Sequence, residues 1–145
     1  MEVTTSRFGK LHAAPADILV FDEGLIGLRA CCRWVVLADA QNAALGWLQS
    51  IDDGDAALGV VSPRRFVPDY QLRVSRQDLD PLGLAAAHDA QVVVIVSRHA
   101  EGLSLNLRAP LIINVETRRG RQIIAKEPLP VQYALSTTGD LRKTA

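Results

Sequence analysis

The stretch from residue 103 to 115 (Leu-Ser-Leu-Asn-Leu-Arg-Ala-Pro-Leu-Ile-Ile-Asn-Val) constrains the fold more than any other part of the chain. Its first half alternates leucine with polar residues, so a strand here would bury a leucine row and expose a polar row. Pro110 cannot donate to a central ladder and belongs at an edge, a strand start or a bulge. Residues 111–115 are almost continuously apolar, which is typical of a strand covered on both faces. The stretch therefore predicts two strands separated at the proline.

Strand-like segments recur on both sides of this stretch, with turn residues between them. Residues 45–51 and 56–61 predict a hairpin around the four-residue loop Asp52–Asp55. Residues 70–74 alternate in polarity as a strand would. A turn at Arg119–Gly120 is expected to join two further strands.

Other local signals complete the expected fold. Gly24 and Gly27 permit a tight bend with positive φ. Ser75, followed three residues later by Asp78, predicts the start of a short helix. The β-branched run 92–96 predicts a core strand. The pattern as a whole predicts an all-β protein, a small single-domain β-barrel-like fold of about ten short antiparallel strands with one short helix.

Length and charge limit the classes of function. With 145 residues, 48% hydrophobic, the chain fits one domain, expected over 1–135, with a flexible tail over 136–145. Its net charge of zero gives no general attraction for nucleic acid or an anionic membrane. The charge is split, because residues 1–63 hold 4 basic and 8 acidic residues and residues 64–145 hold 12 and 8. Such a split can steer a polar partner, unless folding mixes the two halves.

The sequence also predicts a compartment. Its first residues lack the basic and apolar segments of a signal peptide, and its longest apolar run is far shorter than a spanning helix requires. The two cysteines are adjacent, which does not form a disulfide framework. A soluble protein in the reducing cytoplasm is expected.

None of the reactive residue types stands at the spacing of a catalytic or metal motif. The three histidines lie far apart, and the adjacent cysteines are interpreted as small strand residues. The acidic turn lacks the twelfth-position glutamate and the flanking helices of a calcium loop. No catalytic residue, cofactor or metal is expected, which favours a binding protein. The residues considered are His12, His88, His99, Cys31, Cys32, Asp52, Asp53 and Asp55.

Four blocks, in order, resemble the FliW family of flagellar assembly factors. The first reads Phe-Asp-Glu-Gly-Leu-Ile-Gly-Leu, close to the family signature Phe-x-x-Gly-Leu-x-Gly-Phe. Leu28 stands where the family usually has phenylalanine, and the arginine usual after the tyrosine near residue 133 is missing. The matching blocks cover nearly the whole chain through Ala125. They are residues 21–28, residues 47–50 with 61–70, residues 82–84, and residues 106–114 with 122–124.

The resemblance implies a cytoplasmic protein without enzymatic activity and without a cofactor. Members of this family bind flagellin before its export and the RNA-binding regulator CsrA. For this chain we expect no direct binding to nucleic acid or membrane. When flagellin is scarce, the family member holds CsrA and prevents it from repressing flagellin translation. When flagellin accumulates, it captures the family member and releases CsrA.

Candidate contact residues come from the second and fourth blocks. Each has a structural alternative, because an aromatic side chain can anchor the core, an aspartate can cap a turn, and a polar strand face can simply be solvated. The candidates are Phe66, Asp69, Tyr70, Asn106, Leu107, Arg108 and Pro110.

Two rival functions remain open on the sequence. One is a small RNA- or phosphate-binding β-barrel that uses basic loops, although no stacking aromatic accompanies them. The other is an enzyme with an unrecognised pocket. The basic-loop residues are Arg64, Arg65, Arg118, Arg119 and Arg121.

Overall fold

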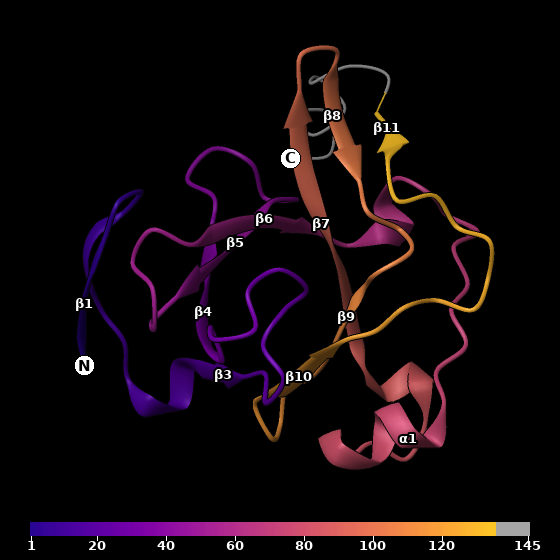
Figure 1. Ribbon diagram of the computed structural model, residues 1–145, viewed down its shortest axis with the longest axis horizontal. Helices are drawn as coiled ribbons and strands as arrows, with labels where there is room; N and C mark the ends of the chain where they lie inside the picture. The colour runs from indigo at the N-terminus through magenta and orange to yellow at the C-terminus, as the bar shows by residue number, and fades with distance from the viewer. Residues whose placement is uncertain (136–145) are drawn as a thin grey trace.

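The computed structural model describes residues 1–135, which fold mainly as β-structure (Figure 1). The strands are β1 (Glu2–Thr5), β2 (Gly9–His12), β3 (Ile18–Val20), β4 (Arg33–Ala38), β5 (Gly46–Ser50), β6 (Ala57–Val61), β7 (Gln91–His99), β8 (Gly102–Leu105), β9 (Leu111–Asn114), β10 (Arg119–Gln122) and β11 (Tyr133–Ala134). The single α-helix of this part of the chain is α1 (Arg76–Leu79), and the 3₁₀ turns are η1 (Pro15–Asp17), η2 (Pro63–Arg65), η3 (Asp80–Leu82) and η4 (Ala87–Asp89). The predicted flexible tail, 136–145, lies outside the described residues.

Seven strands close into a barrel. Their order is β7-β6-β5-β4-β3-β10-β9, and β9 pairs back onto β7. The nine-residue β7 makes this closure possible, because Gln91–Val93 pair with β9, 94–96 with β6 and 96–99 with β8. Figure 1 shows the far half of β7 and β8 projecting from the barrel as a hairpin, with β11 alongside β8.

A separate ribbon of β1 and β2 covers one side of the barrel. Its turn places the Arg7 guanidinium 4.2 Å from the centre of the Trp47 ring, and Phe8 meets the same ring edge-on at 6.1 Å. Behind the turn, Val3 and Leu11 pack against a small core cluster. An otherwise exposed face of Trp47 on β5 is thereby covered.

The structure of residues 103–115 confirms most of what their sequence pattern predicts. The leucines of its first half are buried, β9 is buried along its whole length, and Pro110 comes directly before β9 begins. Two residues differ from the prediction, because Val115 lies beyond the end of β9 and is 50% exposed, and Ser104 is only 4% exposed. β11 pairs with β8 at this position, and the Ser104 hydroxyl lies 2.7 Å from Nε2 of His99. The polar residues that were expected to face solvent are therefore covered at the first of them, Ser104.

Four further expectations need correction. Residues 70–74 alternate between buried or half-buried and exposed, but they pair with no strand in the described chain. The turn expected at Arg119–Gly120 lies at 115–118, with Arg118 at φ 59°, and both predicted turn residues belong to β10. The cysteines precede β4 rather than lie in it. Finally, β10 pairs in parallel with β3, an exception to the expected antiparallel order.

Most of the other predictions are confirmed. β5 and β6 form the hairpin around the acidic turn, and 92–96 lies within β7. Ser75 caps α1, accepting a hydrogen bond from the Asp78 amide. Gly24 and Gly27 have φ of 65° and 83°, so the loop between β3 and β4 bends tightly there.

The loop between β3 and β4 contributes to the barrel core. Phe21, Leu25 and Trp34 are each at most 1% exposed and belong to one core cluster. Strand β10 can pass over Phe21 only because residue 120 is glycine. A Cβ there would lie 2.4 Å from Cζ of Phe21.

We expect Gly120→Ala to destabilise the protein by about 1–3 kcal/mol, because the added methyl group overpacks the core. Gly46→Ala is a matched control on β5, where a Cβ would make only ordinary contacts, at 3.5 Å or more. Chemical denaturation of the two variants measures the difference. Equal stability of both variants would show that Phe21 moves aside without cost.

Candidate functional site

The second and fourth sequence blocks meet at one buried hydrogen bond. The Tyr70 hydroxyl donates to the carbonyl oxygen of Leu107 at 2.9 Å. Tyr70 follows the turn η2, and Leu107 lies in the link from β8 to β9. Residues far apart in sequence thus form one continuous region of the molecule, the Tyr70–Leu107 junction, which consists of 66–70 and 106–110.

Four of the predicted contact residues hold this junction together. Tyr70, Leu107 and Pro110 are buried. The Asn106 side chain is half-buried, and its Oδ1 accepts hydrogen bonds from the amides of Arg108 and Ala109 at 3.2 and 3.1 Å. An asparagine that bonds the backbone two and three residues ahead fixes a turn. These residues therefore have a structural role, whatever they contribute to binding.

The remaining three predicted residues reach the surface. Asp69 and Arg108 are exposed, one from each side of the junction, and Phe66 is half-buried against a core cluster. A negative and a positive side chain are thus presented by a rigid support. Such an arrangement suits contact with another macromolecule, and it contains no nucleophile activated by a neighbouring base.

Two hollows beside Tyr70 were not anticipated from the sequence. One, of about 520 Å³, lies between η2, the segment 70–74 and the start of β7. The other, of about 620 Å³, is lined by Arg64, Gln71, Leu72, Arg73, Lys126 and Glu127. The alternation of 70–74 indicates that Leu72 and Val74 face inward and Gln71 and Arg73 outward, but it does not indicate that hollows lie beside them.

The basic loops of the RNA-binding alternative are largely engaged within the chain. Arg119 forms an ion pair with Asp22 at 2.8 Å, and Arg121 pairs with Asp78 at 3.1 Å and Glu23 at 3.4 Å. The partners Asp22 and Glu23 come from the acidic first half of the sequence, so folding mixes the two halves.

The other arginines of this set also make contacts. Arg118 donates to the carbonyl oxygen of Asp17 at 2.9 Å, and Arg64 donates through Nε to that of Tyr70 at 3.1 Å. Both acceptors are neutral carbonyl oxygens, so these bonds orient the two guanidinium groups and leave their positive charge in place.

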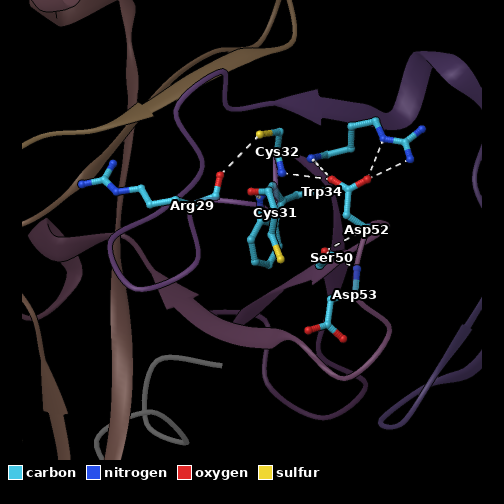
Figure 2. Close-up of polar contacts among 8 residues, drawn as sticks. Arg29, Cys31, Cys32, Trp34, Ser50, Asp52 and Asp53 are labelled. Carbon is cyan, nitrogen blue, oxygen red and sulfur yellow. Dashed lines mark hydrogen bonds and ion pairs between the residues drawn. The ribbon is translucent and has the colours of Figure 1, made fainter.

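The acidic turn between β5 and β6 accepts hydrogen bonds from the backbone at the start of β4. Asp52 accepts hydrogen bonds from the amides of Cys32 and Arg33, each at 2.9 Å, and forms an ion pair with the Arg33 guanidinium at 2.8 Å (Figure 2). Partial burial opposes ionisation, but the bonds from Arg33 and Cys32 outweigh it and lower the pKa of Asp52 below its usual value. On the same turn, Ser50 Oγ accepts from the Asp53 amide at 2.9 Å. The turn is thus held by its own hydrogen bonds.

Cys31 is buried beside Trp34, whose indole N–H donates to the Cys31 carbonyl at 2.9 Å. Cys32 is half-buried, with its sulfur 3.7 Å from the carbonyl oxygen of Arg29 (Figure 2). Residues 1–135 contain no group of three or more histidine, cysteine and acidic side chains that could hold a metal ion. No helix in this part of the chain is long and apolar enough to cross a membrane.

Comparison with known proteins decides the family. A family model described as "FliW protein" matches residues 2–135, almost the whole described chain. The chain belongs to the FliW family. The resemblance drawn from the four sequence blocks is thereby confirmed.

Relatives named flagellar assembly factor FliW match over most of their length. One from Caldanaerobacter subterraneus subsp. tengcongensis is 35% identical over 127 residues, covering 86% of this chain and 85% of the relative. One from Azoarcus sp. is 35% identical over 130 residues, covering 84% and 89%. A protein from Desulfotalea psychrophila named flagellar assembly factor FliW 2 is 32% identical over 138 residues, covering 90% and 91%.

A solved structure confirms the FliW fold. The crystal structure of the flagellar assembly factor FliW superposes with a TM-score of 0.83 at 23% identity, covering 92% of this chain and 95% of that one. The predicted β-barrel-like architecture with one short helix is therefore correct.

The buried phenol of Tyr70 makes the stability of the protein depend on pH. Burial of the phenol, and next the charge of Glu127, raises the pKa of Tyr70 to about 12, whereas tyrosine in an unfolded chain ionises near pH 10. Between these values the unfolded state loses the proton first, so the free energy of unfolding falls as the pH rises. We expect the wild type to lose about 2–3 kcal/mol from this group between about pH 10 and pH 12.

The variant Tyr70→Phe has no such proton and should retain only the pH dependence of the other groups. At pH 7 it should itself cost about 1 kcal/mol, because the Leu107 carbonyl loses a buried donor. Urea unfolding of both proteins across this pH range measures both effects. If the free energies of unfolding of the two proteins changed with pH in the same way, the phenol would not be desolvated in the folded state.

Proposed function

We propose that this chain is a cytoplasmic, non-enzymatic flagellar assembly factor that acts by binding flagellin and the regulator CsrA. The observation that carries the proposal is the FliW family match along residues 2–135, in a chain that keeps the family's ordered sequence blocks. The structure is compatible with it, because the Tyr70–Leu107 junction presents exposed polar groups on a buried, hydrogen-bonded support. By holding CsrA, the protein antagonises CsrA repression of flagellin translation.

Such a partner switch requires that the two binding free energies be negatively coupled. Overlapping sites are the simplest route, since one occupant then excludes the other. To act on CsrA away from its RNA site, the protein must bind RNA-free CsrA more tightly than the RNA-bound form, and the shift cannot exceed that difference. Each tenfold change in RNA affinity requires about 1.4 kcal/mol of differential binding.

The exposed residues of the junction are the proposed contacts. Arg108 projects from a turn that Asn106 fixes through two backbone hydrogen bonds, and Asp69 projects from the facing segment. Because the support is already ordered, binding does not have to pay for ordering a loop. Asn106→Ala would remove the turn's own hydrogen bonds, so it tests stability and binding together. Arg108 gives the cleaner test.

We expect Arg108→Glu to weaken binding to flagellin or CsrA about tenfold or more, because an exposed cation is replaced by an anion at the contact. Its thermal unfolding should match the wild type, since the side chain is exposed. Arg98→Glu is the matched control, because Arg98 is also exposed but lies on the projecting β7–β8 hairpin. Isothermal titration with each purified partner measures the effect.

Wild-type affinity of Arg108→Glu for both partners would remove the junction from the interface. Failure of the wild-type protein to bind either partner would overturn the proposed function itself. The same preparations test the RNA-binding alternative, for which affinity for the flagellin mRNA leader should fall steeply with salt. The arginine ion pairs lead us to expect no such binding.

A further inference from the structure

The segment 70–74 has the alternating burial of a strand but belongs to no sheet in the described residues. Its side chains alternate between inward and outward, yet it forms no ladder with any strand in residues 1–135. In this part of the chain the backbone amides of Gln71, Leu72 and Val74 donate no hydrogen bond, whereas that of Arg73 donates to Glu127 at 3.1 Å. Unpaired backbone along an extended segment is a template for pairing with another strand.

The direction of the unpaired groups follows from strand geometry. In an extended chain the backbone groups of successive residues point to opposite sides. Because the Arg73 amide points at Glu127, those of Leu72 and Val74 are expected to point away from it. The 520 Å³ hollow is lined by both of these residues and by Val92 of β7, together with polar residues such as Arg64 and Gln91, so a partly apolar pocket lies beside this segment.

The charge around the segment is one-sided. Arg64, Arg73 and Lys126 line the second hollow and are exposed, and the only carboxylate lining it is Glu127. Within the described residues, the side chains of Arg73 and Lys126 have no hydrogen-bond or ion-pair partner. The two hollows share Arg64 and Leu72, so the positive rim and the first hollow are neighbours along this segment, and together they are called the groove.

We propose that this groove docks an extended acidic peptide, which pairs as a strand with 70–74. An apolar side chain of the peptide enters the hollow beside Leu72 and Val92, and its carboxylates meet Arg73 and Lys126. Alternation within a strand gives both contacts at once, because successive side chains point to opposite faces. The inference rests on the proposed function only in that the chain acts by binding proteins.

Selection of random dodecapeptides displayed on phage, using the purified full chain, tests the composition of the ligand. We expect recovered peptides to alternate Asp or Glu with Val, Ile or Leu. A synthetic copy of the strongest peptide should bind Arg73→Glu/Lys126→Glu at least tenfold more weakly than wild type. It should bind the control Arg98→Glu, which reverses one positive charge on the β7–β8 hairpin, as tightly as wild type.

Hydrogen exchange and backbone chemistry test the strand pairing. The bound peptide should slow hydrogen exchange at the amides of Leu72 and Val74. Alternate peptide bonds of the ligand can be N-methylated in two ways, at the odd-numbered or at the even-numbered residues. One of these two sets should abolish binding, because only one set of amides faces the segment 70–74. The inference is overturned if selection gives no acidic peptide, if the double variant binds as tightly as wild type, or if these amides exchange unchanged. It is likewise overturned if an oligonucleotide, and no peptide, binds the groove.

The outcome is separable from that of the proposed function, because the selection uses neither flagellin nor CsrA. If the protein bound the peptide but neither flagellin nor CsrA, the peptide-binding groove would be supported and the proposed function would be overturned. If instead the peptide tests failed and the double variant bound both partners with wild-type affinity, the proposed function would be supported and the peptide-binding groove would be ruled out.

Discussion

The pairing of β9 with β7 is the interaction on which the rest of the structure depends. Without it the seven strands would form an open, curled sheet with two unprotected edges, and with it the edges disappear. β9 is suited to this place because all four of its residues are buried. Complete burial of one leucine or isoleucine side chain is worth about 1.5–3 kcal/mol, so the closing strand also supplies much of the core.

Barrel closure determines where the binding surfaces lie. The link from β8 to β9 must turn sharply as the chain leaves the projecting hairpin and enters the barrel, and Asn106 fixes that turn. The Tyr70 hydroxyl then ties the segment after η2 to the same link. As a result, residues such as Asp69 and Arg108 occupy set positions although neither belongs to a strand. Interaction surfaces in loops commonly depend on a rigid scaffold in this way.

Local periodicity predicted much of the fold, and the failures occurred where distant residues decide. The leucine row, β9, the β5–β6 hairpin and the cap at Ser75 follow from spacing alone. The polarity of Ser104 could not reveal that β11 covers it. Gly120 looks like a turn residue, but it is needed for close approach to Phe21, a residue about a hundred positions earlier.

For the candidate site, the sequence blocks named the two segments that meet at Tyr70. They gave no indication that Arg73, Lys126 and Leu72 share a groove, because no pattern within the sequence reports that a strand-like segment lacks a partner. The parallel placement of β10 beside β3 has a consequence for synthesis. β3 pairs with a strand made about a hundred residues later, so during translation the barrel stays an open sheet until β10 has left the ribosome. Any recognition that depends on the closed barrel therefore waits until β10 has been made.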